Sequence, residues 1–579
     1  MSTTTNAPLE TLPDWARELS EKYYSRTLSM FAIHGNVRDI VPLRRPGKTE
    51  FPSLHQFLRE ALFGRRDLVL TYDRGGGISF AHPDMQADFR TALAGYDAFH
   101  GSSYSQSLPR NPDGVLNMLE SYLRVRVADG KTIAVILDFA ETIAPAGDGS
   151  TMGSEDRNTI VILKRWAQNL TFLRADVTIC LIAENLSELN QGIVQNPGVA
   201  AIRIPHPDES ERLEFIQSQL TETSLPAGSD VGAAALSKLT AGLKRVQLQS
   251  LICYAYENRQ PMTLKFLMQR KKDLIEAESG GLLEFVQSRF DLSTVAGHEP
   301  AKKKLRDAAS ALRTGRTDVL PMGYVICGPV GTGKTFLITC FAGEVGIPAV
   351  MLKNFRSMWQ GQTEGNLERV LHLLKAMSPI VVIVDEADAQ LGDRSSSGDS
   401  GVGNRVFAQI AQFMGNTELR GKVIWFLLTC RPDLLPVDLK RQGRAEEHIA
   451  LFYPDSDEER LAMWRAMQKK TGSQLSSPDS EKLFLQRGGT LSGADIEAVL
   501  VRARMLSAMA NEAQIGVDDL KAALEDFIPP SYPNEIELQN LVAVLECTSK
   551  SLLPEKFQRM DRAEVTRRVG ELSVGERAQ

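Results

Sequence analysis

The feature that most constrains this chain is a glycine-rich segment near its middle, set between two apolar runs. The run at 324–327 predicts a buried strand, and the run at 336–341 predicts the first turns of a helix. Glycines between them let backbone N–H groups turn toward a phosphate, and the helix N-terminus adds partial positive charge. The sequence therefore predicts a phosphate-binding loop, which consists of Gly328, Pro329, Val330, Gly331, Thr332, Gly333, Lys334 and Thr335.

The end of this loop and a second motif predict a nucleotide and a metal ion. Lys334 is placed to reach the β and γ phosphates, and Thr335 to ligate Mg²⁺. About 50 residues further on, five apolar residues at 380–384 precede Asp385 and Glu386. Such a run suits a central strand buried on both faces, and α/β sheets bind ligands at the C-terminal ends of their strands. We expect Asp385 to hold Mg²⁺ through water and Glu386 to polarise the water that attacks the γ-phosphate.

Composition sets the broad class. Hydrophobic residues at 43% and charged residues at 24% of 579 are globular values, and the length suits three or four domains. The net charge of −6 argues against a strongly nucleic-acid-directed protein, although a local basic groove would escape this argument. The six cysteines show no CxxC spacing, which favours buried thiols over disulfides or a zinc site. Without an apolar run of 18 residues or a signal-like N-terminus, we expect a cytoplasmic protein with no membrane span.

The first half of the chain carries a similar order of elements. Apolar runs at 132–137 and 177–183 are each followed by polar residues, and their alternation with helices predicts a parallel α/β sheet. A glycine loop at 75–77 follows the strand expected at 67–72, but no Lys followed by Ser or Thr comes directly after it. We therefore expect a turn there, which could descend from a phosphate-binding loop. The stretch 270–281 is expected to link the two halves.

Over about residues 288–530 the sequence resembles the AAA family of ATPases. The phosphate-binding loop matches the Walker A motif of that family, and residues 380–386 match its Walker B motif. Between these motifs lies a polar segment with a tryptophan, where an exposed ring would be a contact residue. Met358, Trp359 and Gln360 match the aromatic pore loop of the family, with Trp359 at the aromatic position.

Further matches imply a site shared between subunits. Arg441 and Arg444 match the arginine fingers of the family, although two arginines at this spacing could also belong to a solvated helix end. A finger from a neighbouring subunit stabilises the charge on the transferring phosphoryl group. The residues that match the adenine-contacting segment and the start of the lid helix are Ala296, Gly297, Gly493 and Ala494.

One position departs from the family pattern. After the strand at 423–428, the family usually places an Asn that helps to position the attacking water. Here Cys430, a weak hydrogen-bond donor, stands at that position, and Thr429 beside it is an alternative donor. Hydrolysis is expected, at a rate that this exchange could lower.

The first half resembles an AAA domain without its chemistry. Asp138 matches the Walker B acid, but Phe139 replaces the adjacent Glu, and residues 196–199 stand where arginine fingers would be. The expected fold is thus two tandem α/β P-loop NTPase-type domains with parallel sheets, the first degenerate and the second with a helical lid. The expected domains are an N-terminal helical segment (1–25), a degenerate AAA-like domain (26–280), a large ATPase subdomain (281–453), a helical lid (454–530) and a C-terminal helical extension (531–579).

The C-terminal extension is expected to be mostly helical. Leu538, Leu541 and Leu545 are spaced by three and then four residues, which indicates an amphipathic helix packed on the ring or on a neighbour. Core packing is favoured there over partner recognition.

The whole chain resembles bacterial and plastid AAA proteins with a degenerate N-terminal half. That resemblance implies ATP and Mg²⁺ as cofactors and a homo-oligomer, a hexameric ring, that remodels or unfolds protein substrates or complexes by gripping them at Trp359. A second hypothesis is a nucleotide-switched scaffold or regulator with slow ATPase activity, which Cys430 and the degenerate first half favour slightly. A third is a nucleic-acid motor or loader, against which the acidic balance and the aromatic pore position weigh.

Overall fold

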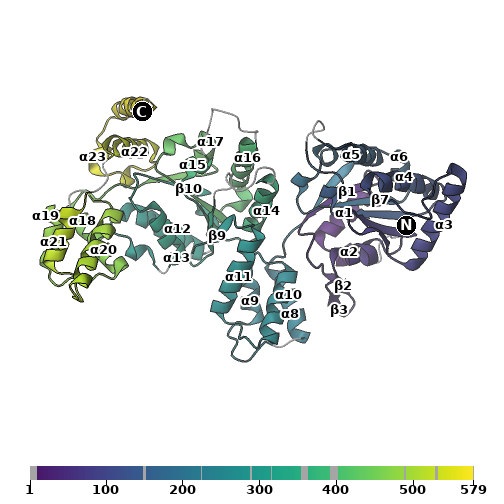
Figure 1. Ribbon diagram of the computed structural model, residues 1–579, viewed down its shortest axis with the longest axis horizontal. Coiled ribbons are helices and arrows are strands. Elements are labelled where there is room, and N and C mark those ends of the chain that lie inside the picture. Colours follow the sequence, from purple (N-terminus) through teal and green to yellow (C-terminus); the bar gives the residue numbers. More distant parts are fainter. Residues whose placement is uncertain are drawn as a thin grey trace. The chain divides into compact units, whose positions relative to one another are not determined.

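The chain folds into two α/β units in tandem. The computed structural model describes residues 9–147, 152–222, 225–286, 288, 290–314, 316–353, 363–391, 402–487, 491–528 and 532–577. The first compact unit is Met1–Ile275 with Glu364–Ala376, and the second is Glu276–Thr363 with Met377–Gln579. Each unit contains a six-stranded sheet flanked by helices (Figure 1).

The sheet of the first unit has the order β5-β4-β6-β7-β1-β8. Its strands are β1 (Met30–Gly35), β4 (Leu68–Asp73), β5 (Gly77–Phe80), β6 (Ile133–Leu137), β7 (Val177–Ile182) and β8 (Val199–Ile204). All neighbours are parallel except β4 and β5. Helices cover both faces, and the central strands are accordingly continuous apolar runs, as in β6, where all five residues are buried.

Alternate residues of each strand enter two separate cores. In β1, Met30 and Ala32 belong to one core, and Phe31 and Ile33 belong to the other. The helices of the first core are α3 (Pro83–His100), α4 (Pro112–Ala128), α5 (Ser154–Ala167) and α6 (Leu170–Arg174). The helices of the second are α1 (Asp14–Tyr24), α2 (Leu54–Phe57) and the π-helical turn η2 (Leu58–Leu62). The N-terminal helix α1 is therefore part of the core of this unit.

The prediction for residues 75–77 is confirmed as a turn, but the suggestion about its descent is wrong. These glycines form the hairpin turn between β4 and β5, in which Asp73 pairs with Gly77. The strand that corresponds in sheet position to the one before the phosphate-binding loop is β1, which lies between β7 and β8. A glycine pattern is local, whereas the place of a strand in a sheet depends on distant residues.

A group of helices follows this sheet. They are α8 (Glu209–Glu222), α9 (Ala233–Leu239), α10 (Arg245–Glu257) and α11 (Leu264–Glu278). The linker expected at 270–281 is wrong for its first part, because residues 270–278 lie inside α11, where Lys271 is buried. No glycine or proline interrupts 264–278, so nothing in that sequence ends the helix before Gly280 and Gly281.

The second sheet has the order β14-β10-β13-β12-β11-β9. Its strands are β9 (Leu283–Phe285), β10 (Gly323–Cys327), β11 (Ala349–Leu352), β12 (Ile380–Val384), β13 (Val423–Thr429) and β14 (Glu447–Ala450). Only the edge pair β9 and β11 is antiparallel. Paired in order, β5, β4, β6, β7, β1 and β8 of the first sheet correspond to β9, β11, β12, β13, β10 and β14. The two sheets are therefore equivalent in strand order and direction.

The helices of the second unit form three groups. Those of the sheet domain are α12 (Glu299–Arg313), α13 (Lys334–Val345), α15 (Ala387–Leu391), α16 (Val402–Met414) and α17 (Val437–Lys440). A helical lid with its own core consists of α18 (Asp457–Thr471), α19 (Asp479–Arg487), α20 (Gly493–Met509) and α21 (Val517–Asp526). The C-terminal extension contains α22 (Pro533–Glu546), η9 (Lys550–Leu552), α23 (Glu555–Gln558) and α24 (Arg562–Arg577).

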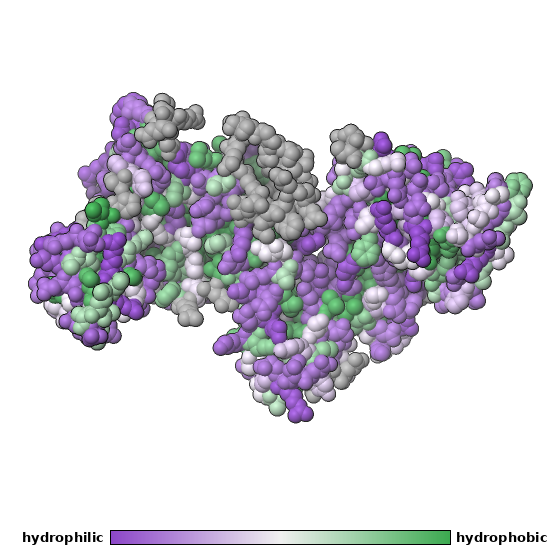
Figure 2. All heavy atoms as spheres, in the orientation of Figure 1, coloured by the Kyte–Doolittle hydropathy of each residue, from purple (hydrophilic) through white to green (hydrophobic). Residues whose placement is uncertain are grey.

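The described surface is largely polar on the face shown in Figure 2, where hydrophobic side chains are scattered among hydrophilic ones. Among the described helices, none has both the length and the apolar character needed to cross a membrane.

Candidate nucleotide-binding site

The loop between β10 and α13 is shaped by glycines at close approaches. Gly328 has φ +139°, and a Cβ there would collide with the carbonyl oxygen of Leu451. Gly331 has φ +81°, and a Cβ there would lie 2.9 Å from the Cβ of Ser492, directly before the lid helix α20. Side chains at these two positions would be strained or would clash, so the loop can close on the chain around it only with glycine.

The ammonium group of Lys334 is held inside the loop. It donates to the carbonyl oxygens of Gly328 at 2.8 Å and Pro329 at 2.9 Å, and it lies 3.1 Å from Sγ of Cys430. The side chain is buried. A phosphate in the loop could accept from the same ammonium group, because these contacts hold it at the mouth of the loop.

Thr335 and Asp385 form the part of the site that could hold a metal ion. Oγ1 of Thr335 donates to Oδ2 of Asp385 at 2.8 Å. The next residue, Glu386, has φ +47°, and its N–H donates to Oδ1 of Asp385 at 2.9 Å. A hydroxyl and a carboxylate are the oxygen ligands that Mg²⁺ prefers. The strained backbone of Glu386 is of the kind that occurs at functional sites.

These side chains surround a cavity of about 430 Å³. Its lining includes Lys334, Asp385, Glu386, Thr429 and Cys430. Thr429 Oγ1 donates to Asp388 at 2.6 Å and accepts from the N–H of Arg431 at 2.8 Å. Of the two residues considered for positioning the attacking water, Cys430 contacts Lys334, whereas the hydroxyl of Thr429 bonds to Asp388 and Arg431.

A second cavity, of about 400 Å³, lies at the predicted adenine end. Ala296 and Gly297 line it together with Met463 of the lid. Gly493 lies beside Met463, because a Cβ on it would be 3.4 Å from Sδ of Met463. Ala494, the next residue, is exposed. Three of the four residues matched to the adenine and lid segments are thus near this cavity.

The two arginines predicted as fingers differ in their surroundings. The side chain of Arg441 is 59% exposed and that of Arg444 only 14% exposed. Arg444 donates to the carbonyl oxygen of Asp438 at 2.7 Å, whereas Arg441 has an ion pair with the exposed Asp438 carboxylate at 3.3 Å. Neither is among the residues that line the two cavities. Met358, Trp359 and Gln360 lie outside the described residues.

The corresponding place in the first unit is filled by the protein itself. His55, the second residue of α2, corresponds to Thr335, the second residue of α13, and its Nε2 lies 2.9 Å from Oδ2 of Asp138. Arg38 donates to both oxygens of Asp138, at 2.9 and 3.0 Å. Its guanidinium also stacks 3.9 Å above the ring of Phe139. Two side chains of the same unit, Arg38 and His55, therefore contact the carboxylate that corresponds to Asp385.

The backbone of the two sites matches despite this difference. Phe139 has φ +49°, close to the +47° of Glu386, and its N–H donates to Asp138 as that of Glu386 does to Asp385. Gly35 corresponds to Gly328, since a Cβ on it would collide with the carbonyl oxygen of Ile204 in the adjacent strand. No sequence motif marked Arg38 or His55, which lie far from Asp138 along the chain.

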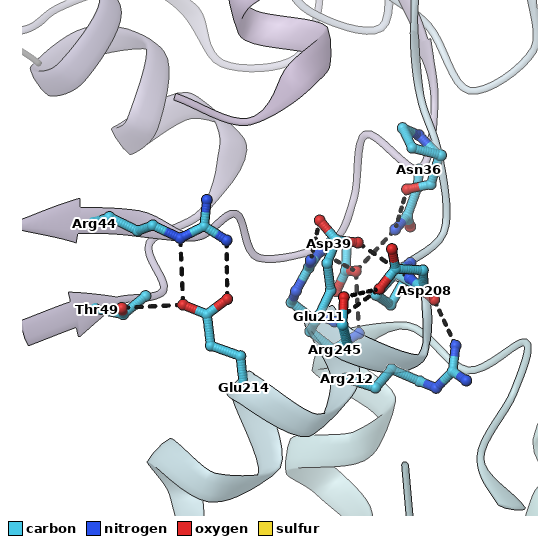
Figure 3. A network of polar contacts seen from close by, with 12 residues as sticks. Asn36, Asp39, Arg44, Thr49, Asp208, Glu211, Arg212, Glu214 and Arg245 are labelled. Atoms are coloured by element: carbon cyan, nitrogen blue, oxygen red, sulfur yellow. Dashed lines mark hydrogen bonds and ion pairs between the residues drawn. The ribbon is translucent and has the colours of Figure 1, made fainter. Parts of the chain in front are cut away.

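The segment that replaces the phosphate-binding loop is bound to the helices of the same unit (Figure 3). The Asp39 carboxylate accepts from the N–H groups of Arg245 at 3.0 Å and Val246 at 2.9 Å, at the start of α10. An inserted hairpin, β2 (Leu43–Arg45) and β3 (Lys48–Glu50), presents Arg44 and Thr49 to Glu214 of α8 (Figure 3). A carboxylate of the chain thus satisfies a helix N-terminus that could otherwise receive an anion.

Models of known families match this chain in three successive segments. Residues 324–453 match the ATPase family associated with various cellular activities (AAA). These residues therefore form a domain of the AAA family. Residues 4–205 match an AAA+ chaperone N-terminal Rossmann-like domain, and residues 210–280 match an AAA+ chaperone second helical domain. The resemblance to AAA proteins with an additional N-terminal AAA-like half is confirmed.

Individual relatives are distant. The chain is 26% identical to the cell division cycle protein 48 homologue of Archaeoglobus fulgidus, over 64% of this chain and 54% of that protein. It is 30% identical to the ATP-dependent zinc metalloprotease FtsH 3 of Synechocystis, over 41% of this chain and 40% of the relative. It is 23% identical to an uncharacterized AAA domain-containing protein, ycf46, of Guillardia theta, over 66% of this chain and 74% of the relative. The chain thus spans about half or less of the first two relatives.

Proposed function

We propose that the second unit binds ATP with Mg²⁺ and hydrolyses it to ADP and phosphate. The observation that carries this proposal is the contact of Thr335 with Asp385 beside the buried ammonium of Lys334, at the edge of one cavity. A hydroxyl, a carboxylate and an ammonium group in this arrangement have the chemistry that a metal-bound triphosphate requires. Membership of a family of ATPases supports the same conclusion.

Each residue then has a distinct role. Lys334 balances charge on the β and γ phosphates, and Thr335 and Asp385 hold Mg²⁺, which neutralises charge as the γ-phosphate leaves. Glu386, one residue beyond Asp385 and on the rim of the cavity, accepts a proton from the attacking water. Cys430 takes the place of a stronger donor near that water, so we expect slow turnover.

We infer that the active form is a homo-oligomeric ring, a hexamer. Arg441 is exposed and does not line the cavity of its own subunit, as expected of a residue that acts on a neighbour. The lid helix α20 also has an exposed apolar stripe at a spacing of four residues, where Val501 is 53%, Met505 65% and Met509 74% exposed. Such a stripe supports contact with another subunit.

The output of this ATPase is proposed to be the remodelling of protein substrates or complexes, with Trp359 as the gripping residue. The trap variant Glu386→Gln, purified with ATP, should retain a substrate protein that mass spectrometry can identify. Trp359→Ala should keep basal hydrolysis within about threefold while substrate-stimulated hydrolysis is lost, because an aromatic ring grips without touching nucleotide. Normal remodelling by Trp359→Ala would exclude threading through this residue.

A nucleotide-switched scaffold is the second candidate. The contact of Cys430 with Lys334 favours it, because a thiol at this position suits tight binding with slow hydrolysis. Hydrolysis measured with and without candidate protein substrates separates the two functions, since only a remodelling machine should be stimulated.

A further inference from the structure

The C-terminal extension, residues 532–577, contacts the nucleotide site at its phosphate end. The N–H of Val330, in the phosphate-binding loop, donates to Oε1 of Gln539 in α22 at 2.9 Å. Gln539 is 4% exposed, so water does not readily replace it. Tyr532, Glu535 and Gln539 line the same cavity as Lys334 and Asp385. The extension therefore forms one wall of the proposed phosphate pocket.

The backbone N–H and the carbonyl oxygen of Val330 both form hydrogen bonds with residues outside the phosphate-binding loop. Its N–H is bound by Gln539, and its carbonyl oxygen accepts from the hydroxyl of Tyr453, which follows β14. Gln539 is oriented in turn by Glu535, whose Oε1 accepts from Nε2 of Gln539 at 3.1 Å. With both groups fixed, the tip of the loop has little freedom to rotate away from a phosphate.

The extension also contributes to the base end of the site. Residues 551–555 line the second cavity, opposite Ala296 and Gly297. This segment is held in place by a contact between the rings of Phe452 and Phe557, whose centroids are 4.9 Å apart. One continuous stretch of chain thus reaches both ends of the proposed nucleotide site.

An ionic cluster around the buried His448 anchors this stretch to the sheet domain. Glu546, the last residue of α22, accepts from Nζ of Lys440 at 2.9 Å and lies 2.9 Å from Nδ1 of His448. Thr548 then pairs with His448 through backbone and hydroxyl contacts. Because Lys440 directly precedes Arg441, the anchor of the extension and the proposed finger share one segment.

We propose that the C-terminal extension is an integral part of the nucleotide site, in which Gln539 is a positioning residue for the phosphate-binding loop and residues 551–555 form the outer wall of the base pocket. This inference rests on the proposed ATP binding of the second unit. It assigns a role to a part of the chain that lies beyond the matched AAA segment, which ends at residue 453. Gln539 acts through Val330, so its effect is on the shape of the loop before nucleotide arrives.

Two substitutions in the full chain separate the two ends of the site. Gln539→Met keeps the length of the side chain but removes the acceptor, and Ser551→Trp narrows the base pocket without touching the loop. The matched control is Asn540→Leu, which removes an amide one residue away whose Nδ2 bonds only within the helix, to Ile536 O at 3.0 Å. Affinity is measured by calorimetry with a non-hydrolysable ATP analogue and with inorganic tripolyphosphate, which has no base.

Gln539→Met should weaken binding of both probes about tenfold, the scale of one buried hydrogen bond. Ser551→Trp should weaken binding of the analogue by about tenfold and leave tripolyphosphate unchanged. Gln539→Met should raise KM for ATP and leave kcat within about twofold, because a positioning contact acts alike on the ground and transition states. It should also speed hydrogen exchange at residues 328–335 in the nucleotide-free chain, whereas Asn540→Leu should change neither exchange nor affinity.

Wild-type affinity and loop exchange in Gln539→Met would overturn the positioning role, as would tighter binding. Equal effects of Ser551→Trp on both probes, or none on the analogue, would overturn the base-pocket wall. If the unaltered chain binds neither probe, the proposed ATP binding fails instead, and the exchange of the nucleotide-free loop still decides whether Gln539 positions it.

Discussion

The two units of this chain have sheets with the same strand order, but the surroundings of the strand-end carboxylate differ between them. In the second unit, Asp385 and Lys334 line a cavity, and Thr335 donates to Asp385. In the first unit, His55 and Arg38 contact the corresponding carboxylate, Asp138, and balance its charge. The difference shows that the same backbone geometry around a strand-end carboxylate occurs with different side chains beside that carboxylate.

Charge balance explains which groups surround each carboxylate. A carboxylate buried at the end of a central strand requires a cation or several donors. A bound metal could serve Asp385, whereas Arg38 and His55 serve Asp138 permanently. The same holds at the helix N-terminus of α10, where Asp39 provides the negative charge that a phosphate would provide elsewhere. We expect the first unit to keep one fixed arrangement whatever the nucleotide.

The largest expected effect tests the proposed finger, Arg441. Arg441→Ala should lower ATP hydrolysis by roughly 10³-fold while nucleotide binding stays within about threefold, because the guanidinium acts on a neighbouring site in the transition state. Arg444→Ala should also lower the melting temperature, since Arg444 is largely buried and bonds to the backbone of Asp438.

Mixing two variants tests whether Arg441 acts on the site of a neighbouring subunit. Arg441→Ala and Glu386→Gln chains should each be inactive alone, but a mixed ring would contain interfaces with an intact base on one side and an intact finger on the other. Mixing should therefore restore measurable hydrolysis. A mixture that stays inactive, although mixed rings form, would place Arg441 outside a shared site.

The second prediction compares Glu386 and Phe139, which have nearly the same positive φ angle. Glu386→Gln should lower hydrolysis by at least about 100-fold, the usual scale for a general base, with ATP binding retained. Phe139→Gln is the matched control, because Phe139 has the same positive φ in the first unit. It should leave turnover within about twofold. Near-normal turnover of Glu386→Gln would remove that residue from the mechanism.

The sequence predicted those parts of the candidate site whose residues are neighbours along the chain. The phosphate-binding loop, Asp385 and Glu386 each follow a strand directly, so a local pattern carries both the element and its chemistry. Arg38 and His55 were missed because they reach Asp138 only through the fold, across 100 residues in the case of Arg38. The contact of Gln539 with Val330 spans 209 residues and likewise has no local signal.

The predicted fold class is confirmed, but two local predictions were wrong for a related reason. The parallel sheets and their repetition follow from apolar runs that alternate with helices, and the strand orders bear this out. The glycines at 75–77 suggested the descendant of a phosphate-binding loop, yet the equivalent strand is β1, which ends at Gly35. The basic residues at 270–272 suggested a linker, but their side chains suit a helix and one of them packs inside.

The third prediction changes the two equivalent carboxylates. Burial alone would raise the pKa of Asp138, but His55 and Arg38 lower it, so the carboxylate is ionised in the folded unit. Asp138→Asn should lower the free energy of unfolding by about 1–3 kcal/mol, because it removes the negative charge that pairs with Arg38 and His55. Asp385→Asn should instead weaken Mg²⁺-dependent ATP binding by about tenfold with little loss of stability.

Calorimetric titration and chemical unfolding of both variants check this contrast. The unaltered chain and Asp138→Asn should each bind one nucleotide per chain. A second micromolar site, in either protein, would contradict the interpretation of the first unit as closed. A stability loss that is equal in both variants would contradict the division of roles between the two carboxylates.

The smallest expected effect is a pH dependence of the stability of the C-terminal extension in the second unit. Both ring nitrogens of His448 face acceptors, the Glu546 carboxylate at 2.9 Å and the carbonyl oxygen of Ala445 at 2.9 Å, so only the protonated ring satisfies both. Burial alone would lower the pKa of His448, but these acceptors raise it above its ordinary value of 6.5. The stabilisation is therefore complete below pH 6.5 and is lost as the pH rises through the raised pKa.

Hydrogen exchange of α22, corrected for the intrinsic effect of pH, should consequently show weaker protection at pH 9 than at pH 6, by up to about 1 kcal/mol. His448→Gln cannot become protonated and should show the same corrected protection at both pH values. Helices α3 and α4 belong to the first unit and provide the internal reference. An equal loss of protection in both units would mean that general unfolding, and not the anchor at Glu546, responds to pH.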